Sequence, residues 1–327
     1  MALDLSESLV IGISATALFD LSEADKMFQE KIEQDPDTAM EAYRKYMLEN
    51  EDEPLEDGTG MPLVKALLNL NKFQKEGESP IVEVIVLSRN SPETGFRVLK
   101  EIRRRGLKIS RSAFTAGESN VEYLEAFYVD LFLTTNEKDA QRVIDSNVCA
   151  SAIVKAPPKS NKHLNEDQVR FAFDADAVLF NEESELVHQR EGLSNFHANE
   201  DSKQDTPLAK GPHANLLIKL SKIQERLPER IEFSPVKLAI MTARNSPAEM
   251  RVIKTLRDWN VYVDEAFFLG GLQKSRFLKA FKPHIFFDDQ DSHLDPASGD
   301  IPSAKVLYPS SSPLKEIIEN RKNSKKE

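Results

Sequence analysis

The segment VKLAIMTARNSPAEMRVIKTL, residues 236–256, decides the fold class of this chain. Its apolar first part predicts a buried strand that ends at the small hydroxyl residue Thr242. Its second part predicts a helix, because SPAE from Ser246 has the form of a capping box and the apolar residues Ile253 and Leu256 follow at helical spacing. A strand followed directly by a helix is the repeating unit of α/β proteins with parallel sheets.

The chain contains a second, diverged copy of this segment. Residues 82–102 read VEVIVLSRNSPETGFRVLKEI and share the tetrapeptide RNSP with residues 236–256. Three more blocks recur in the same order, at offsets of about 150–160 residues: IGISATALF with FAFDADAVL, PLVKALLNLNKFQ with PHANLLIKLSKIQ, and AGESNVEYLEAFYVDLFL with GGLQKSRFLKAFKPHIFF. A duplicated unit of about 155 residues explains this order. We therefore expect two similar domains, residues 1–160 and residues 161–327.

Each copy predicts the same order of elements: a strand, a polar helical insertion, a second strand, a helix, a glycine turn, another helix and a third strand. The insertion of the first copy is expected to form two exposed helices. The insertion of the second copy, about residues 181–235, is expected to form a cap. The predicted fold class is therefore α/β, with two duplicated Rossmann-like domains that have parallel sheets and helical cap insertions.

Composition excludes several classes of function. The net charge of −11 argues against a nucleic-acid partner, which normally needs a basic surface. Cys149 is the only cysteine, so the chain has no internal disulfide and no cysteine-based zinc site. The apolar run SLVIGISATALF is too short to span a membrane, and no positive charge precedes it as in a signal peptide. We expect a cytoplasmic protein with no membrane partner.

Polar residues of the second copy fall where its strands are expected to end. Asp174 follows VRFAF, Thr242 follows KLAIM, and Asp288-Asp289 follow HIFF. Parallel sheets bind ligands beyond the carboxyl ends of their strands, and Lys274 adds a cation at the start of a helix. Several carboxylates beside apolar walls are costly unless a cation neutralises them. Oxygen ligands without thiols favour Mg²⁺ as that cation.

These residues resemble the signature of the haloacid dehalogenase superfamily of phosphohydrolases. The D-x-D motif of that signature matches Asp174-Ala175-Asp176. Its hydroxyl residue corresponds to Thr242, its lysine corresponds to Lys274, and its acidic pair corresponds to Asp288-Asp289. The wider text, including FDADAVLFNEESE, PLAKGP, LAIMTAR and KPHIFFDDQ, resembles the cytosolic type I 5′-nucleotidase family, and SATALFDL extends the resemblance to the N-terminal half. Val178 departs from the superfamily pattern, which often has threonine there. The resemblance implies haloacid-dehalogenase-like domains and Mg²⁺-dependent hydrolysis of nucleoside 5′-monophosphates, notably AMP.

The resemblance also implies a role for each matching residue. Asp174 is the implied nucleophile, which forms an aspartyl phosphate, and Asp176 is the implied general acid and base. Thr242 and Lys274 are implied to hold phosphate oxygens. The ligands implied for Mg²⁺ are Asp174, the main-chain carbonyl of Asp176, Asp288 and, directly or through water, Asp289.

Several alternatives stay open at this point. Arg244 either binds phosphate or pairs at the surface, and Phe196 either stacks on the substrate base or packs in the core of the cap. The chain could instead be a phosphatase or phosphotransferase for another phosphate monoester, or a non-catalytic nucleotide sensor. The sequence lacks the P-loop and dinucleotide-binding motifs. It leaves open a nucleotide effector and assembly into a homo-oligomer.

The first copy lacks every proposed catalytic charge. Alignment of the copies places Ser14 opposite Asp174, Thr16 opposite Asp176, Asn120 opposite Lys274, and Thr134-Thr135 opposite Asp288-Asp289. We therefore expect the first domain to have the fold without the chemistry. It would complete the substrate pocket, bind an effector nucleotide or support the second domain.

Overall fold

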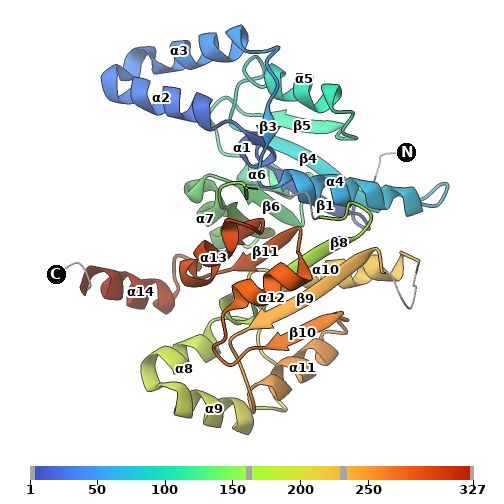
Figure 1. Cartoon of the computed structure of the whole chain (residues 1–327), viewed down its shortest axis with the longest axis vertical. Coiled ribbons are helices and arrows are strands. Elements are labelled where there is room, and N and C mark those ends of the chain that lie inside the picture. The colour runs from blue at the N-terminus through green and yellow to red at the C-terminus, as the bar shows by residue number, and fades with distance from the viewer. Residues whose placement is uncertain (1–3, 160–163, 229–233, 325–327) are drawn as a thin grey trace.

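A continuous, mostly parallel sheet of ten strands runs through the protein in the computed structural model, which describes residues 4–159, 164–228 and 234–324 (Figure 1). From one edge the order is β5 (Arg111–Phe114), β4 (Val82–Ser88), β1 (Leu9–Ile13), β6 (Leu131–Thr134), β7 (Ala150–Val154), β12 (Ser303–Lys305), β11 (Ile285–Asp288), β8 (Val169–Phe173), β9 (Val236–Thr242) and β10 (Glu265–Phe268). A separate short sheet pairs β2 (Phe19–Asp20) with β3 (Glu56–Asp57). The predicted α/β class is confirmed.

The two halves of the sheet have the same internal order and the same register. In the first half Ile11 of β1 lies opposite Val84 of β4, and in the second half Phe171 of β8 lies opposite Leu238 of β9. These are corresponding positions in the two aligned copies. The matching order supports the predicted duplication, which stays a prediction. The expected boundary between residues 160 and 161 lies outside the described residues.

The halves are joined where β7 and β12 pair antiparallel, while each half is parallel within itself. Thr134 lies opposite Ile153, Ile153 opposite Lys305, and Lys305 opposite Asp288. The carboxyl ends of β6 and β11 therefore reach the same level of the sheet from opposite directions. The edge of the first half where its strands end therefore lies next to the corresponding edge of the second half.

Helices cover the sheet and form a pair at each end of the molecule (Figure 1). Those of the first half are α1 (Ala15–Leu18), α2 (Ser22–Gln34), α3 (Pro36–Glu49), α4 (Met61–Asn69), η1 (Leu70–Phe73), α5 (Phe96–Arg104), α6 (Val121–Leu124) and α7 (Glu137–Ser146). Those of the second half are η2 (Ala175–Leu179), α8 (Glu183–Glu191), α9 (Leu193–Ser202), α10 (Ala214–Glu225), α11 (Glu249–Asp258), α12 (Lys274–Phe281), α13 (Asp291–Ser298) and α14 (Pro313–Ser324). None of the described helices is long and apolar enough to cross a membrane.

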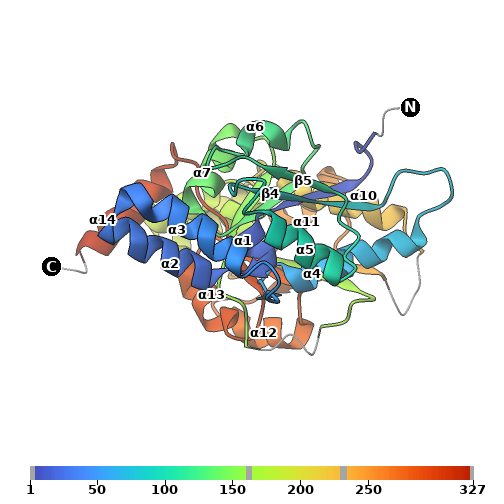
Figure 2. The same ribbon diagram turned by 90° about the horizontal axis from the view of Figure 1, so that it is seen from above.

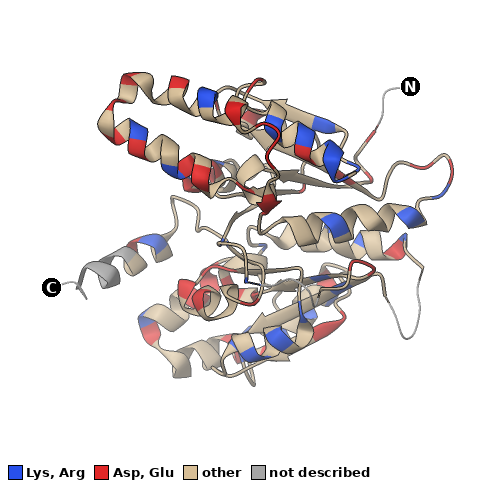
Figure 3. Cartoon of the chain, turned by 45° about the horizontal axis from the view of Figure 1, so that its top comes forward, with Lys and Arg blue, Asp and Glu red and all other residues tan. Residues whose placement is uncertain are grey.

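The predicted insertions form the paired helices α2–α3 and α8–α9, at opposite ends of the molecule (Figure 1). Figure 2 shows that α2, α3 and α14 extend to the same side of the molecule. Charged residues are spread along α2 and α3, as Figure 3 shows, and few of their residues are buried. Helix α10 also lies within the second insertion, but Leu216 and Leu220 place it in the main core. The part of that insertion that stands off the sheet is therefore α8–α9.

One hydrophobic core extends across both halves. It includes Ile11 and Val64 from the first half and Phe171 and Leu220 from the second. The capping box expected at Ser246 does not form. Helix α11 begins at Glu249 with Ala248 as its N-cap, because the residues before it make a turn in which the Ala248 N–H donates to the Asn245 carbonyl at 2.8 Å.

Candidate active site

Asp174 lies at the carboxyl end of β8 and is the N-cap of the irregular turn η2. Its side chain accepts a hydrogen bond of 2.7 Å from the Ala175 N–H and is 5% exposed. Ala177, with φ of 60°, has the left-handed conformation that is costly for a residue with a Cβ. The non-helical backbone at Asp176 and Ala177 separates the two carboxylates of the D-x-D motif. Asp174 faces the sheet edge and Asp176 faces Arg244.

Lys274, the first residue of α12, lies between two of the predicted carboxylates. Its Nζ is 2.8 Å from Asp174 Oδ1 and 2.7 Å from Asp288 Oδ2, and the residue is only 3% exposed. Burial alone would lower the pKa of this ammonium, but the two carboxylates raise it above its ordinary value. Lys274 is therefore a fixed positive charge at the end of the sheet.

The three buried carboxylates titrate differently. Burial, with repulsion from Asp288 and Asp176, raises the pKa of Asp174 to about 7 despite the attraction of Lys274. Burial and the neighbouring Asp288 hold the pKa of Asp289 well above its ordinary value. Burial also disfavours ionised Asp288, but Lys274 and His293 outweigh it and lower that pKa. Ionisation of all three carboxylates would give the group more negative charge than one lysine neutralises, so the ionised form favours a further cation.

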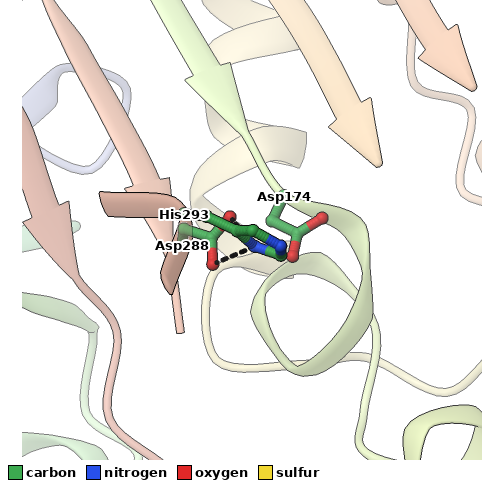
Figure 4. A group of neighbouring side chains, drawn as sticks. All are labelled: Asp174, Asp288 and His293. Carbon is green, nitrogen blue, oxygen red and sulfur yellow. Dashed lines mark hydrogen bonds and ion pairs between the residues drawn. The ribbon is translucent and has the colours of Figure 1, made fainter. Parts of the chain in front are cut away.

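Asp174, Asp288 and His293 each offer a ligand atom within 4.8 Å of the others (Figure 4). His293 Nδ1 is 3.1 Å from Asp288 Oδ2, so the imidazole also orients that carboxylate. Asp289 adds a buried Oδ1 that has no hydrogen-bond partner among the described residues, while the Tyr308 hydroxyl donates to its Oδ2. Mg²⁺ prefers such carboxylate oxygens, and neighbouring groups such as His293 and Tyr308 commonly orient its ligands. The donor set fits Mg²⁺.

Thr242 lies at the end of β9, the strand next to β8. It is 1% exposed, and its Oγ1 accepts a 3.1 Å hydrogen bond from the Arg244 N–H. The hydroxyl proton remains available to donate to an anion at the sheet edge. Asp174, Thr242 and Asp288 thus lie at the carboxyl ends of the neighbouring strands β8, β9 and β11. Lys274 joins them from the start of α12.

Arg244 is buried and does not pair at the surface. Its Nε and Nη2 donate to the two carboxylate oxygens of Asp176 at 2.8 and 2.6 Å. Its Nη1 donates to Glu200 of the cap helix α9, and Glu200 also accepts from Arg251 at 2.9 Å and from Ser184 at 2.8 Å. Arg244 therefore links Asp176 to the cap, and its burial shows that the surface alternative is wrong. Its contact with phosphate stays a prediction.

Phe196 is 6% exposed and lies within the cap. The Arg244 guanidinium carbon is 5.3 Å from the centre of its ring, and His188 and His197 pack against the same ring. This placement favours the cap-core alternative over stacking on a substrate base. The ring also shields the Arg244–Glu200 pair from water.

The corresponding edge of the first half contains hydroxyl groups that bond to one another. Ser14 is the N-cap of α1, and its Oγ lies 3.1 Å from Thr16 Oγ1. Thr16 Oγ1 in turn lies 2.6 Å from Thr135 Oγ1. These neutral groups replace the charged set of the second half, in keeping with the expected loss of chemistry.

Four residues near this site were missed from the sequence: His293, Tyr308, Glu200 and Glu185. His293 had a signal, because it follows the acidic pair by about one helical turn in DDQDSH. No sequence pattern marks Glu200 or Tyr308, because each meets its hydrogen-bond partner only after distant segments of the chain fold together. Glu185 lies on α8, and burial together with repulsion from Asp176 raises its pKa.

Comparison with known proteins agrees with this geometry. Residues 1–313 match the 5′-nucleotidase family. Human cytosolic 5′-nucleotidase 1B is 31% identical over 296 residues, an alignment that covers 89% of this chain and 47% of the relative. The chain thus spans about half the length of this curated relative. No solved structure matches the chain. The predicted resemblance is confirmed: the chain belongs to the 5′-nucleotidase family.

Proposed function

We propose that this chain is a Mg²⁺-dependent 5′-nucleotidase that hydrolyses nucleoside 5′-monophosphates such as AMP to the nucleoside and phosphate. The observation that supports it most is the buried placement of Lys274 between Asp174 and Asp288 at the carboxyl end of the sheet. A fixed ammonium beside carboxylates suits a phosphate ester, whose charge it balances. Family membership and the name of the human relative favour a nucleotide as the substrate.

In this proposal Asp174 and Asp176 perform the two steps. An Asp174 oxygen attacks phosphorus and the bond to the 5′ oxygen breaks, while Asp176 gives a proton to the leaving oxygen. For this step Asp176 must first take up that proton from solvent and release one of its two bonds to Arg244. Asp176 then takes a proton from a water molecule, whose oxygen attacks the aspartyl phosphate and releases phosphate from Asp174. Thr242 and Lys274 hold the phosphate oxygens during both steps.

Asp174, Asp288 and Asp289 would hold Mg²⁺, together with the main-chain carbonyl of Asp176. When bound, the ion would neutralise negative charge on the phosphate and the carboxylates. His293 and Tyr308 keep Asp288 and Asp289 in place through their hydrogen bonds. Asp289 Oδ1, which has no hydrogen-bond partner within the described part of the chain, supports this assignment.

Arg244 is a positioning residue for Asp176 in this proposal. Its two hydrogen bonds fix the orientation of the carboxylate, and Glu200 connects that orientation to the cap. We place the protein in the cytosol, following its relative. A nucleotide effector and a homo-oligomer stay predictions.

Phosphate release tests the proposal directly. The purified chain is incubated with nucleoside monophosphates, sugar phosphates and p-nitrophenyl phosphate, each with Mg²⁺ or with a chelator. We expect release from nucleoside monophosphates that the chelator abolishes. Preference for another monoester, or transfer to a nucleoside, would favour the phosphatase or phosphotransferase alternatives. Binding without release would favour a nucleotide sensor.

A further inference from the structure

A cavity of about 370 Å³ lies beside the catalytic carboxylates and reaches into the first half. Asp289 lines it on the catalytic side, Glu185 lines it from the cap, and Glu137 and Gln141 line it from α7. Its volume falls within the range of roughly 300–1,000 Å³ that is usual for small-molecule sites. Asp289 directly follows Asp288 in the chain, so the cavity adjoins the predicted catalytic group.

The register of the sheet explains why α7 reaches this place. Thr134 at the end of β6 and Asp288 at the end of β11 occupy the same level, with β7 and β12 between them. Three strand spacings separate them, which is about 14 Å. Helix α7 starts at Glu137, shortly after Thr134. Its first turn therefore borders the active site of the second half.

Residues of α7 also fix the opposite wall of the cavity. Gln141 Nε2 donates to the main-chain oxygen of Tyr308 at 2.9 Å, and its Oε1 accepts from Lys315 at 3.3 Å. Asp145 accepts from the N–H and Oγ of Ser310, both at 2.7 Å. Because the Tyr308 hydroxyl donates to Asp289, the first half is connected to a predicted metal ligand through this segment.

The lining suits a neutral, hydroxyl-bearing group with an apolar face. Glu137 and Glu185 offer acceptors for hydroxyl or amino groups, and Leu307 and Ile318 offer apolar surface. Two cations also line this wall: Lys305 already pairs with Asp291, and Lys315 donates to Gln141. A nucleoside matches this combination, whereas further phosphate groups would meet the acidic residues.

We propose that this cavity binds the nucleoside part of a nucleoside 5′-monophosphate, and that Glu137 and Gln141 of the first half contact it. This inference rests on the proposed function, because it takes the phosphate to lie at Asp174. It gives the first half a direct part in substrate selection. Glu137 is exposed at the start of α7, so its replacement leaves the core unchanged.

The experiment compares two substrates in the full-length protein. The ratio of kcat/KM for AMP to kcat/KM for p-nitrophenyl phosphate, which has no nucleoside, is measured with Mg²⁺ for the wild type and Glu137→Ala. We expect the ratio to fall by about tenfold or more, as for the loss of a hydrogen bond to a charged group. Lys138→Ala, an exposed neighbour on α7 that does not line the cavity, should leave the ratio unchanged.

A Gln141→Ala variant should lower the same ratio, since it removes the second proposed contact with the nucleoside. A change of less than about twofold in both lining variants would overturn the proposal while nucleotide hydrolysis stands. Calorimetric titration of AMP into Asp174→Asn, with and without Glu137→Ala, separates the two claims. Weaker binding of AMP when Glu137→Ala is added supports nucleoside binding in this cavity, even if the wild type shows no turnover. Equal AMP affinities in these two titrations count against it.

Discussion

Glu200→Gln is the substitution that probes most sharply how the cap is joined to the catalytic loop. Glu200 is fully buried and accepts hydrogen bonds from Arg244, Arg251 and Ser184. Glutamine keeps the size of the side chain but removes its charge. Arg244 would still pair with Asp176, but Arg251 would lose the carboxylate that neutralises it. Breaking a buried ion pair in this way costs about 3–5 kcal/mol of unfolding free energy.

Urea denaturation measures this loss, and hydrogen exchange in α9 shows where it acts. We expect Glu200→Gln to lower the free energy of unfolding by about 3–5 kcal/mol, with faster exchange in α9. The matched control is Asp201→Asn, an exposed neighbour on the same helix, which should change stability by less than about 0.5 kcal/mol. Equal effects from the two variants would refute the claim that the buried cluster holds the cap.

Three further predictions concern the charges at the sheet edge. Lys274→Met should reduce kcat/KM for AMP by about 10²-fold or more, the usual cost of removing such an electrostatic contact, and phosphate-release kinetics measures it. Tyr308→Phe should weaken Mg²⁺ binding by about 10–100-fold, the usual cost of losing a group that orients a metal ligand; unchanged affinity by calorimetry would contradict this role. The pKa of Asp174 is raised to about 7 in the metal-free protein, so the folded state binds the extra proton and stability falls as pH rises from about 4 to 7. Mg²⁺ must displace that proton from Asp174, so Mg²⁺ should raise Tm more at pH 8, where the proton is already lost, than at pH 6. An equal rise in Tm at the two pH values would contradict the raised pKa of Asp174.

Residues at the ends of strands were the ones that the sequence could predict. Asp174, Thr242 and Asp288 each follow an apolar run, and parallel strands bring such ends to one edge of a sheet. The repeated segments also predicted three of the five sheet strands in each half, and they missed β5, β7, β10 and β12. Local pattern carries this information because each residue is placed by the strand directly before it.

Contacts made by the cap and across the join between the halves could not be predicted in this way. Arg244 meets Glu200 only because α9 folds back over the loop after β9, and the sequence between them shows no pattern. The antiparallel pairing of β7 with β12 joins two short strands in the middle of the sheet, and nothing in the sequence marks them as partners. The cavity that Glu137 lines follows from that pairing.

The central claim is that Asp174 carries the phosphate during hydrolysis. Rapid acid quenching of the protein with Mg²⁺ and nucleoside monophosphate labelled with ³²P, followed by peptide mapping, tests it most directly. We predict a base-labile label on the peptide that contains Asp174, and neither label nor phosphate release in Asp174→Asn. Phosphate release by Asp174→Asn at a rate near that of the wild type would contradict it.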